Sequence, residues 1–560
     1  MTDEPLSYRL DQHPAVPVRW CSGGHGPPAV SLRNALVQAH QIKAVDLTPL
    51  EHASIMTRVL IPLMIDIFGL PANLDQWGKR WREGLFEAGP IDVYFAEHGK
   101  RFDLFHPETP FDQTPGLVAA SGETKPTTVL LVTAPSGNNV PLWLPQTDAQ
   151  APRLDPLRAF TALETVQAYD TAAIKSAAKG DPAARSGKTT GNPVATLGGL
   201  GLVMPLGSSL FETLLLNLPT RKDLPLPTDG VNDSPHWRRP PTGPAWRAEA
   251  TPAGVLDLLT WQSRRVLLIA EPNTDGEPTV HGAVLAAGDR MKSLPAWDYR
   301  TQWRKRSQPR AGQDAHYAVR HQPGRSGWHG LTALLAVNVN TAADEGVRTS
   351  HLLAQVGTAL EYGLLPADYP LNLLLVGLEY GTQSAVVESV FVDDLPLPIR
   401  SLLPDDDLHD ALIDVSQQAE ALRKTLNNLE YNLRRAAGWS LPPGARAGIH
   451  QGNGPGDSLM LRLDGPVRQL LLELQSQPQG LRQALAQWET TAWSMTFTAA
   501  EILLNSASPE AFRGRRSSDS HLINVALAET FFYTTLRKIL ALENERRKAR
   551  PEQFDKKGED

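Results

Sequence analysis

The clearest periodicity of apolar positions lies after Pro404, where apolar residues recur at alternating spacings of four and three. This heptad stripe predicts one long helix with a single apolar face. Asp405, Asp406 and Asp407 stand at its start and Gly438 at its end, where acidic caps and glycine are favoured. The apolar positions are Leu408, Leu412, Val415, Ala419, Leu422, Leu426, Leu429 and Leu433.

Further helical patterns follow at Val467–Gln475, Leu481–Asn505 and Ser520–Arg550, separated by polar stretches. Long helices joined by polar loops pack as antiparallel bundles. We therefore predict a C-terminal four-helix bundle over residues 401–560.

Before Arg400 the patterns are mixed. Thr48-Pro49-Leu50-Glu51 is a capping box that predicts a helix as far as Gly69, and Asp155–Lys175 is also helical in pattern. A polar loop is expected over Lys179–Asn192, and helices over Gly327–Val337 and Ser350–Leu364. Short apolar runs predict strands at Thr127–Ala134, Val266–Ala270, Val280–Ala287, Leu373–Val376 and Ser389–Val392. Without regular alternation of strands and helices, the fold class is α+β, with a large mixed α/β domain over residues 1–400.

Composition limits the class of protein. The formal net charge of -7 argues against a free-standing nucleic-acid binder, because phosphate binding depends on Lys and Arg. The single cysteine, Cys21, can form neither an intrachain disulfide nor a multi-thiolate zinc site. The acidic N-terminus has no signal-peptide pattern, and no apolar run reaches the roughly 20 residues that cross a bilayer. We expect a soluble, cytoplasmic protein without membrane contact.

Basic residues gather in a few places despite the net charge. One run has no acid from Tyr299 to Gln313, and a second is interleaved with glycines such as Gly180. The first run is explained either by a solvated face or by contact with phosphates or the minor groove, and the glycines of the second would let the backbone approach a ligand. The four clusters are Arg300, Arg304, Lys305, Arg306 and Arg310; Lys175, Lys179, Arg185 and Lys188; Arg513, Arg515 and Arg516; and Arg546, Arg547, Lys548 and Arg550. The last cluster, in the final turns of the terminal helix, is explained by favourable charge at a helix end.

The sequence contains no complete catalytic motif. Gly187-Lys188-Thr189 has Pro182 where a phosphate-binding loop needs glycine, and no strand–loop–helix context surrounds it. No histidine pair has metal-ligand spacing, and His321 and His329 are expected to be solvated loop residues. Asp405–Asp407 suits a helix cap better than a metal site. We therefore predict no enzymatic activity, no cofactor and no bound metal.

Six segments form an ordered set along the chain: Leu104–Gln113, Ser136–Asn139, Gly191–Leu197, Leu210–Leu218, Leu259–Arg265 and Gly324-Arg325 with Trp328. In this order they resemble the CasA family, the large subunit of the type I-E CRISPR surveillance complex (Cascade). The resemblance covers nearly the whole chain.

The resemblance implies a non-catalytic subunit with a mixed α/β domain and a helical bundle. Its expected partners are the other Cascade subunits with guide RNA, target double-stranded DNA and a recruited helicase-nuclease. Guide RNA would read the target by base pairing, while this subunit reads the short PAM in duplex DNA and helps to open it.

The resemblance also implies site residues. Gln383, between Thr382 and Ser384 at a hairpin tip, would be the wedge that splits the duplex, and Lys305, between Arg304 and Arg306, would enter the minor groove. The glycine loop of the family corresponds to about Lys179–Lys188, with contacts from Lys179, Gly180, Arg185 and Lys188. The first functional loop corresponds to Asn139, Trp143, Leu144 and Pro145.

Two alternatives stay open. The chain could be a structural scaffold whose basic loops bind guide RNA without reading DNA, and a preference for PAM duplex over RNA would separate the two. It could also be an enzyme with an unrecognised site, which would need a pocket with perturbed titratable groups.

Overall fold

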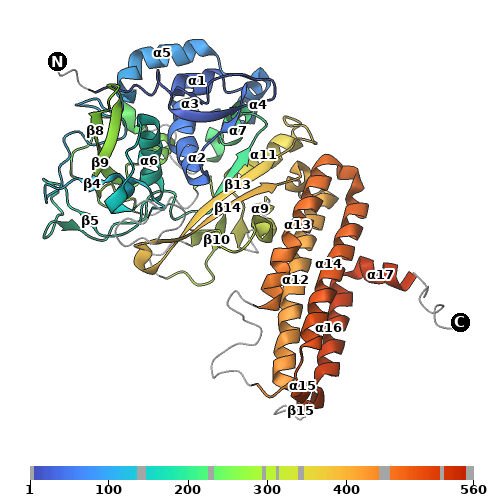
Figure 1. Ribbon diagram of the computed structural model, residues 1–560. Coiled ribbons are helices and arrows are strands. Elements are labelled where there is room, and N and C mark those ends of the chain that lie inside the picture. Colours follow the sequence, from blue (N-terminus) through green and yellow to red (C-terminus); the bar gives the residue numbers. More distant parts are fainter. Residues whose placement is uncertain are drawn as a thin grey trace. The chain divides into compact units, whose positions relative to one another are not determined.

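The structure is a computed structural model that describes residues 6–134, 147–224, 232–292, 298–310, 315–337, 346–439, 454–516 and 522–549. The chain forms two compact units. Unit 1 consists of residues 1–324, 336–365 and 371–394, and unit 2 of residues 325–335, 366–370 and 395–560. Unit 1 contains helices and small sheets, whereas long helices dominate unit 2 (Figure 1). The predicted α+β fold class is confirmed.

The helix predicted after Thr48 is continuous to Gly69 but contains a wide turn. It consists of α2 (Pro49–Ile55), a π-helical turn (Met56–Leu60) and α3 (Ile61–Phe68). Glu51 accepts hydrogen bonds from the Thr48 amide at 3.2 Å and from its hydroxyl at 2.7 Å, as the capping pattern predicts. The π turn carries Arg58, whose side chain is fully buried.

Helix α6 (Pro156–Tyr169) runs through the core of unit 1, where it packs on α2 and on strands β8 (Arg264–Pro272) and β9 (Pro278–Ala287). It ends six residues before the predicted limit at Lys175, because the backbone turns to an extended conformation at Asp170. This turn brings the Asp170 carboxylate to Lys175 and Arg264.

Three-stranded antiparallel sheets account for most strands of unit 1. In one, β9 (Pro278–Ala287) lies between β8 (Arg264–Pro272) and the short β4 (Lys125–Pro126). In another, β13 (Asn372–Tyr380) lies between β7 (Leu202–Leu206) and β14 (Val387–Pro396). The strands predicted within β8, β9, β13 and β14 are confirmed, and each is longer than predicted.

The strand predicted at Thr127–Ala134 is wrong. Thr127–Leu130 is instead a turn of 3-10 helix. The hydroxyl of Thr127 donates to Pro152 O at 2.5 Å, and that of Thr128 donates to Asp148 at 2.5 Å. Side-chain hydrogen bonds of this kind compete with a strand ladder, which explains why β-branched residues here are not in a strand.

The remaining elements of unit 1 complete its surface and core. Ser209 caps the apolar helix that follows it by accepting from the Glu212 amide, and the helix expected after Ser350 is present. These elements are α1 (Leu32–Val37), α4 (Leu74–Glu83), α5 (Ala88–His98), α7 (Leu210–Leu216), α8 (Val255–Leu259), α11 (His351–Glu361), and the sheet of β1 (Val16–Trp20), β2 (Ala29–Val30) and β3 (Ile42–Val45).

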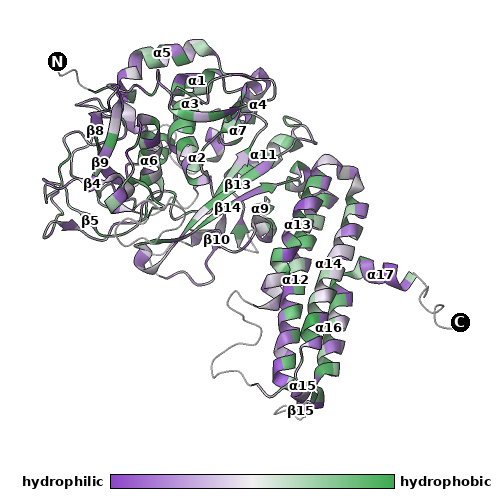
Figure 2. Cartoon of the chain, viewed as in Figure 1, coloured by the Kyte–Doolittle hydropathy of each residue, from purple (hydrophilic) through white to green (hydrophobic). Residues whose placement is uncertain are grey.

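Unit 2 is built on α12 (Asp407–Ala436), whose heptad stripe is entirely buried. Helices α13 (Pro455–Ser476), α14 (Leu481–Asn505) and α16 (Val525–Ile539) pack against it, and each carries both apolar and polar faces (Figure 2). Asp406 caps α12 by accepting from the Leu408 amide at 3.0 Å, which confirms the capping interpretation.

Three helix predictions in unit 2 need correction. Helix α13 begins at Pro455 and includes Pro466, which the sequence pattern treated as a boundary. The terminal helix divides at Leu540 into α16 and α17 (Ala541–Ala549). The helix predicted at Gly327–Val337 reduces to a 3-10 turn (Gly327–Gly330) followed by α9 (Leu331–Leu334).

Within the part of the chain that the structure describes, no helix combines the length and apolar character that crossing a bilayer requires.

A buried charge cluster joins distant parts of unit 1. The Arg58 guanidinium donates to Glu164 and to Asp112, each at 2.8 Å, and to the Trp261 carbonyl oxygen at 2.9 Å. Burial, followed by the neighbouring Asp112 carboxylate, raises the pKa of Glu164 well above its usual range. The two buried carboxylates therefore compete for the single guanidinium charge of Arg58.

Replacing Arg58 by Met tests this cluster. The Arg58→Met variant keeps apolar volume but leaves Asp112 buried without its cation, so we expect a loss of about 3–5 kcal/mol of unfolding free energy. The matched control is Arg153→Met, because Arg153 pairs with Glu271 at an exposed site and such pairs contribute about 0–1 kcal/mol. Calorimetry of the full chain measures the stability of both variants. Equal melting temperatures for Arg58→Met and Arg153→Met would contradict a stabilising role for the buried cluster.

His236 predicts a pH dependence. Burial lowers its pKa to about 3, with Asp112 opposing and Arg58, Arg239 and Arg101 reinforcing the shift. The folded chain keeps His236 neutral while the unfolded chain takes up a proton below about pH 6.5. Its contribution is therefore intact above that pH and is lost, at about 1.4 kcal/mol per pH unit, as pH falls toward 3.

The His236→Gln variant should lose this slope. Unfolding free energies of wild type and variant measured at pH 8 give the packing cost of the substitution alone. If the difference in unfolding free energy between the two proteins stays the same from pH 8 to pH 5, His236 is not buried in its neutral form.

Candidate nucleic-acid interface

The predicted minor-groove lysine lies in a small antiparallel sheet whose central strand is β10. In its register Arg304 is opposite Tyr317, and Lys305 is opposite His316. Because side chains alternate along a strand, Arg304 and Arg306 lie on one face with Tyr317, and Lys305 lies on the other. The basic triplet is thus divided between two faces. The strands are β10 (Trp303–Lys305), β11 (His316–Ala318) and β12 (Val347–Arg348).

Lys305 is exposed, and Arg348 lies near it across the same small sheet. Burial first, and then the nearby Arg348 and Lys305, lower the pKa of His316. A positive field on this face of the sheet suits contact with phosphates.

Arg300 does not belong to the basic patch in which the sequence placed it. It is 3% exposed and forms a bidentate pair with Asp298, at 2.6 and 2.9 Å. Asp298 stands one residue before the acid-free run that begins at Tyr299, so the run hid the partner. Arg304 and Arg310 are exposed, and Arg306 is half-buried.

The predicted loop Lys179–Asn192 contains one strand of a short hairpin, β5 (Lys175–Ser176) with β6 (Lys188–Thr189). Lys175 was expected in a surface patch, but it is buried and bound to Asp170 at 2.6 Å. It is therefore an anchor at the base of the hairpin. Lys179, Gly180, Arg185 and Lys188 are at least partly exposed, as a nucleic-acid contact requires.

The tip of this hairpin brings Arg185 and Lys188 side by side. Their backbones exchange two hydrogen bonds, at 2.9 and 3.0 Å, around Ser186 and Gly187. Both intervening residues have positive φ, 49° and 72°, which is typical of a two-residue hairpin turn. Lys188 thus lies on a strand after a tight turn, unlike the lysine of a phosphate-binding loop.

Gln383 lies in the turn between β13 and β14, as predicted. The turn from Thr382 to Ser384 is a single 3-10 turn, and Gln383 is exposed at φ 56° and ψ 20°. This is the left-handed region, which is uncommon for a residue other than glycine. Backbone strain of this kind is often found at functional sites.

One segment of unit 1, residues 172–201, links the three predicted contact regions. At its start the Ala172 amide donates to Ser384 O in the Gln383 turn at 2.8 Å. It then forms the β5–β6 hairpin, and at its end the Gly201 amide donates to Val319 O at 3.0 Å, just after β11. The Gln383 turn, the 179–188 tip and the β10–β11 sheet are therefore tied to one continuous stretch of chain.

Other predicted residues lie elsewhere. Asn139, Trp143, Leu144 and Pro145, the first functional loop, fall outside the described residues, as does Arg550. In unit 2, Arg513 ends the short helix α15 (Pro509–Arg513), and Arg515 and Arg516 form an exposed strand, β15, paired with β16 (Leu522–Ile523). In α17, Arg546 and Arg547 pair with Glu543, as expected for a helix end.

Within the described ranges, one group brings metal-ligating atoms close together: Asp112, Glu164 and His236, with these atoms within 4.8 Å of one another. Arg58 already binds both carboxylates, so a guanidinium occupies the position from which a cation would neutralise them. These residues are therefore better interpreted as part of a stable core than as a metal site.

The two loop histidines are not solvated. His321 stacks on Phe391, and one of its ring nitrogens lies 2.9 Å from Leu202 O, while His329 lies edge-on against the buried Trp328. Sequence reasoning also missed Tyr317 and Arg320. The short strand His316–Ala318 was the available signal, because its alternation places Tyr317 beside Arg304 once the two strands are paired.

Comparisons with known proteins agree on one family. The sequence model of the family "CRISPR-associated protein Cse1" matches residues 12–499. The crystal structure of Thermobifida fusca Cse1 is 29% identical, with a TM-score of 0.81 over 97% of this chain and 100% of that one. The crystal structure of Cse1 from Acidimicrobium ferrooxidans is 26% identical, with a TM-score of 0.77 over 97% and 99%.

A curated relative, CasA/Cse1 of Thermus thermophilus, is 30% identical over 276 residues, which are 47% of this chain and 49% of the relative. That match thus spans about half the length of the relative. A chain in a solved CRISPR RNA-guided surveillance complex has the same fold, at 20% identity and a TM-score of 0.69 over 95% of this chain and 100% of that one.

The backbone of Gln383 gives a stability prediction. Gly adopts positive φ without steric cost, so Gln383→Gly should raise the unfolding free energy by about 1 kcal/mol. The same change at Gln12, an exposed residue without positive φ, should not stabilise the chain. Chemical denaturation measures both, and a loss of stability in Gln383→Gly would contradict a strained turn.

Proposed function

The chain belongs to the CRISPR-associated Cse1 family, and we propose that it is the non-catalytic large subunit of an RNA-guided DNA surveillance complex. In this role it recognises the PAM in duplex DNA and opens the duplex beside it. The fold that it shares with a chain of an RNA-guided surveillance complex supports the assembly. Guide RNA and the other subunits are its partners there, and a helicase-nuclease is recruited afterwards.

The observation that carries this proposal is the joining of the three contact regions through residues 172–201. The backbone bonds of Ala172 to Ser384 and of Gly201 to Val319 hold a turn, a hairpin tip and a sheet on one stretch of chain. A site for duplex DNA needs several contacts in fixed register, because phosphate contacts position a protein and groove contacts discriminate. Segments that moved independently could not supply that register.

Each region has a distinct part in the proposed mechanism. Lys305 enters the minor groove, whose degenerate pattern permits several related PAM sequences. Lys179, Arg185 and Lys188 neutralise neighbouring phosphates, and Gly180 lets the backbone approach. Gln383, held on a turn whose backbone leaves few alternatives, enters the base stack at the first pair to open.

The rival roles are weaker. A scaffold that faces only guide RNA gives no reason for a strained, exposed glutamine at a hairpin tip. An enzyme would need accessible groups with perturbed pKa values, but the strongest such cluster, Asp112 with Glu164 and His236, is buried and closed by Arg58.

The test is DNA binding by the assembled complex with Gln383→Ala or Lys305→Ala in this subunit. We expect each variant to weaken PAM-dependent binding about tenfold or more, which corresponds to about 1.4 kcal/mol. Gln383→Ala should reduce strand opening most, because Gln383 is the proposed wedge. Gel shift gives affinity, and 2-aminopurine fluorescence beside the PAM gives opening.

Matched controls are Gln12→Ala and Lys79→Ala, two exposed residues elsewhere in unit 1. If both site variants bind and open PAM duplex as wild type does in an intact complex, the wedge and the groove contact must be assigned to other residues. PAM discrimination without this subunit, or equal salt-dependent binding to guide RNA and PAM duplex, would favour the scaffold role.

A further inference from the structure

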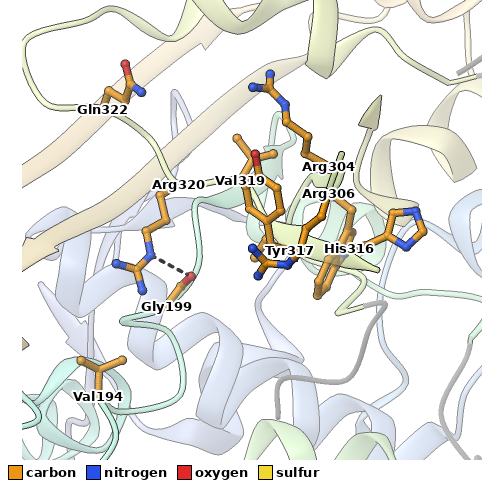
Figure 3. A pocket seen from close by; sticks show the side chains of 11 residues that line it. Val194, Gly199, Arg304, Arg306, His316, Tyr317, Val319, Arg320 and Gln322 are labelled. Carbon is orange, nitrogen blue, oxygen red and sulfur yellow. Dashed lines mark hydrogen bonds between the residues drawn. The ribbon is translucent and has the colours of Figure 1, made fainter. Parts of the chain in front are cut away.

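A basic pocket of about 620 Å³ lies beside the proposed interface. Arg304, Arg306 and Tyr317 line one side of it, and Arg320 with Gly199 and Val194 lines the other (Figure 3). This volume is in the range of small-molecule sites. All of its lining residues belong to unit 1.

The lining combines positive charge with apolar walls. Three of the lining residues are arginines, and none of the described lining residues is Asp or Glu. Val194, Ala318 and Val319 supply apolar surface between the charges. A ligand that matches this lining carries a negative charge next to a flat or apolar part.

The pocket is held in shape by the backbone around it. The Val319 amide donates to Gln302 O at 2.9 Å, and Val319 O accepts from Gly201. Arg320 lies over the Gly199 carbonyl oxygen, with its Nε at 3.4 Å (Figure 3). A side chain on Gly201 would come within 2.5 Å of Val319 O, so the close approach of these strands needs glycine. A preformed site loses little conformational entropy on binding.

An aromatic ring lies at the centre of the charge. The Arg306 guanidinium lies 4.8 Å from the centroid of the Tyr317 ring, which is half-buried. Aromatic rings of this kind stack on nucleobases without sequence preference, and arginines nearby bind the phosphates.

We propose that this pocket holds an unpaired nucleotide of single-stranded DNA, with its base against Tyr317 and its phosphates on the arginines. The inference rests on the proposed function, because opening the duplex supplies the single strand. A base paired in a duplex cannot enter a concave pocket, whereas a base freed from the stack can. Lys305 lies on the opposite face of β10, so duplex and single strand need not compete for the same side chains.

The experiment measures fluorescence anisotropy of a labelled oligothymidylate of about 10 nucleotides with the full chain. Tyr317→Ala should weaken binding about 5- to 100-fold, the range for loss of one stacked base, and Arg320→Ala should weaken it by removing a phosphate contact. Tyr317→Phe keeps the ring and should bind within about twofold of wild type. Arg19→Ala is the matched control, since Arg19 is 64% exposed and pairs loosely with the exposed Asp46.

Melting temperatures establish that every variant is folded. Single-strand binding by Arg320→Ala and Tyr317→Ala at wild-type strength, or an equal loss in Arg19→Ala, would overturn the proposal. Displacement of the oligonucleotide by thymidine monophosphate at comparable concentration would make the pocket a mononucleotide site, and tighter binding of oligouridylate would make it an RNA site. Either result also overturns the proposal.

PAM discrimination by the assembled complex separates this inference from the proposed function. Tyr317→Ala should bind PAM duplex as wild type does before the strands open, while Gln383→Ala fails. If the pocket variants bind single strands as wild type does while Gln383→Ala loses PAM-dependent binding as expected, the pocket proposal is rejected and the proposed function stands. Intact PAM discrimination in the absence of the subunit rejects the proposed function.

Discussion

The guanidinium of Arg58 is the point on which unit 1 depends, because a buried cation must be satisfied completely or not be buried. Its three partners, Glu164, Asp112 and the Trp261 carbonyl, come from α6, the loop after Phe111 and the segment before β8. The π turn in the first long helix holds Arg58 among them. These contacts fix α6 against the sheet of β8 and β9, and thereby fix the chain that leaves α6 toward the interface.

A second buried ionic group extends this order to the surface loops. Asp170, just after α6, binds Lys175 and Arg264, and Arg264 also donates to the carbonyl oxygens of Thr171 and Pro193. Both ends of the 175–189 hairpin are therefore tied to β8. Buried charges thus hold the backbone that presents the exposed lysines and arginine of the hairpin. Asp112, Trp261 and Arg264, which lie in segments that resemble the family, are buried and maintain the fold.

The sequence predicts features that repeat or lie close together in the chain. The heptad stripe of α12, the cap at Thr48 and the turn at Gln383 each depend on a few neighbouring residues, and all are present. Features set by distant partners were not predictable. Lys175 and Arg300 were predicted to be surface charges, because the neighbouring sequence does not show that each is buried and paired with an aspartate. The division of Arg304 and Lys305 between two faces follows from the three-residue strand β10, which is too short to show a clear pattern in the sequence.

The order in which the Arg58 cluster is completed has a consequence for synthesis. Arg58 leaves the ribosome 203 residues before Trp261. At roughly 5–20 residues per second, that interval is on the order of 10–40 seconds. Throughout it the nascent chain carries a cation whose place in the core does not yet exist, together with apolar helices that have no sheet to cover. We therefore expect chaperone supply to affect the yield of this protein mainly while its first 260 or so residues are made, before the helices of unit 2 are translated.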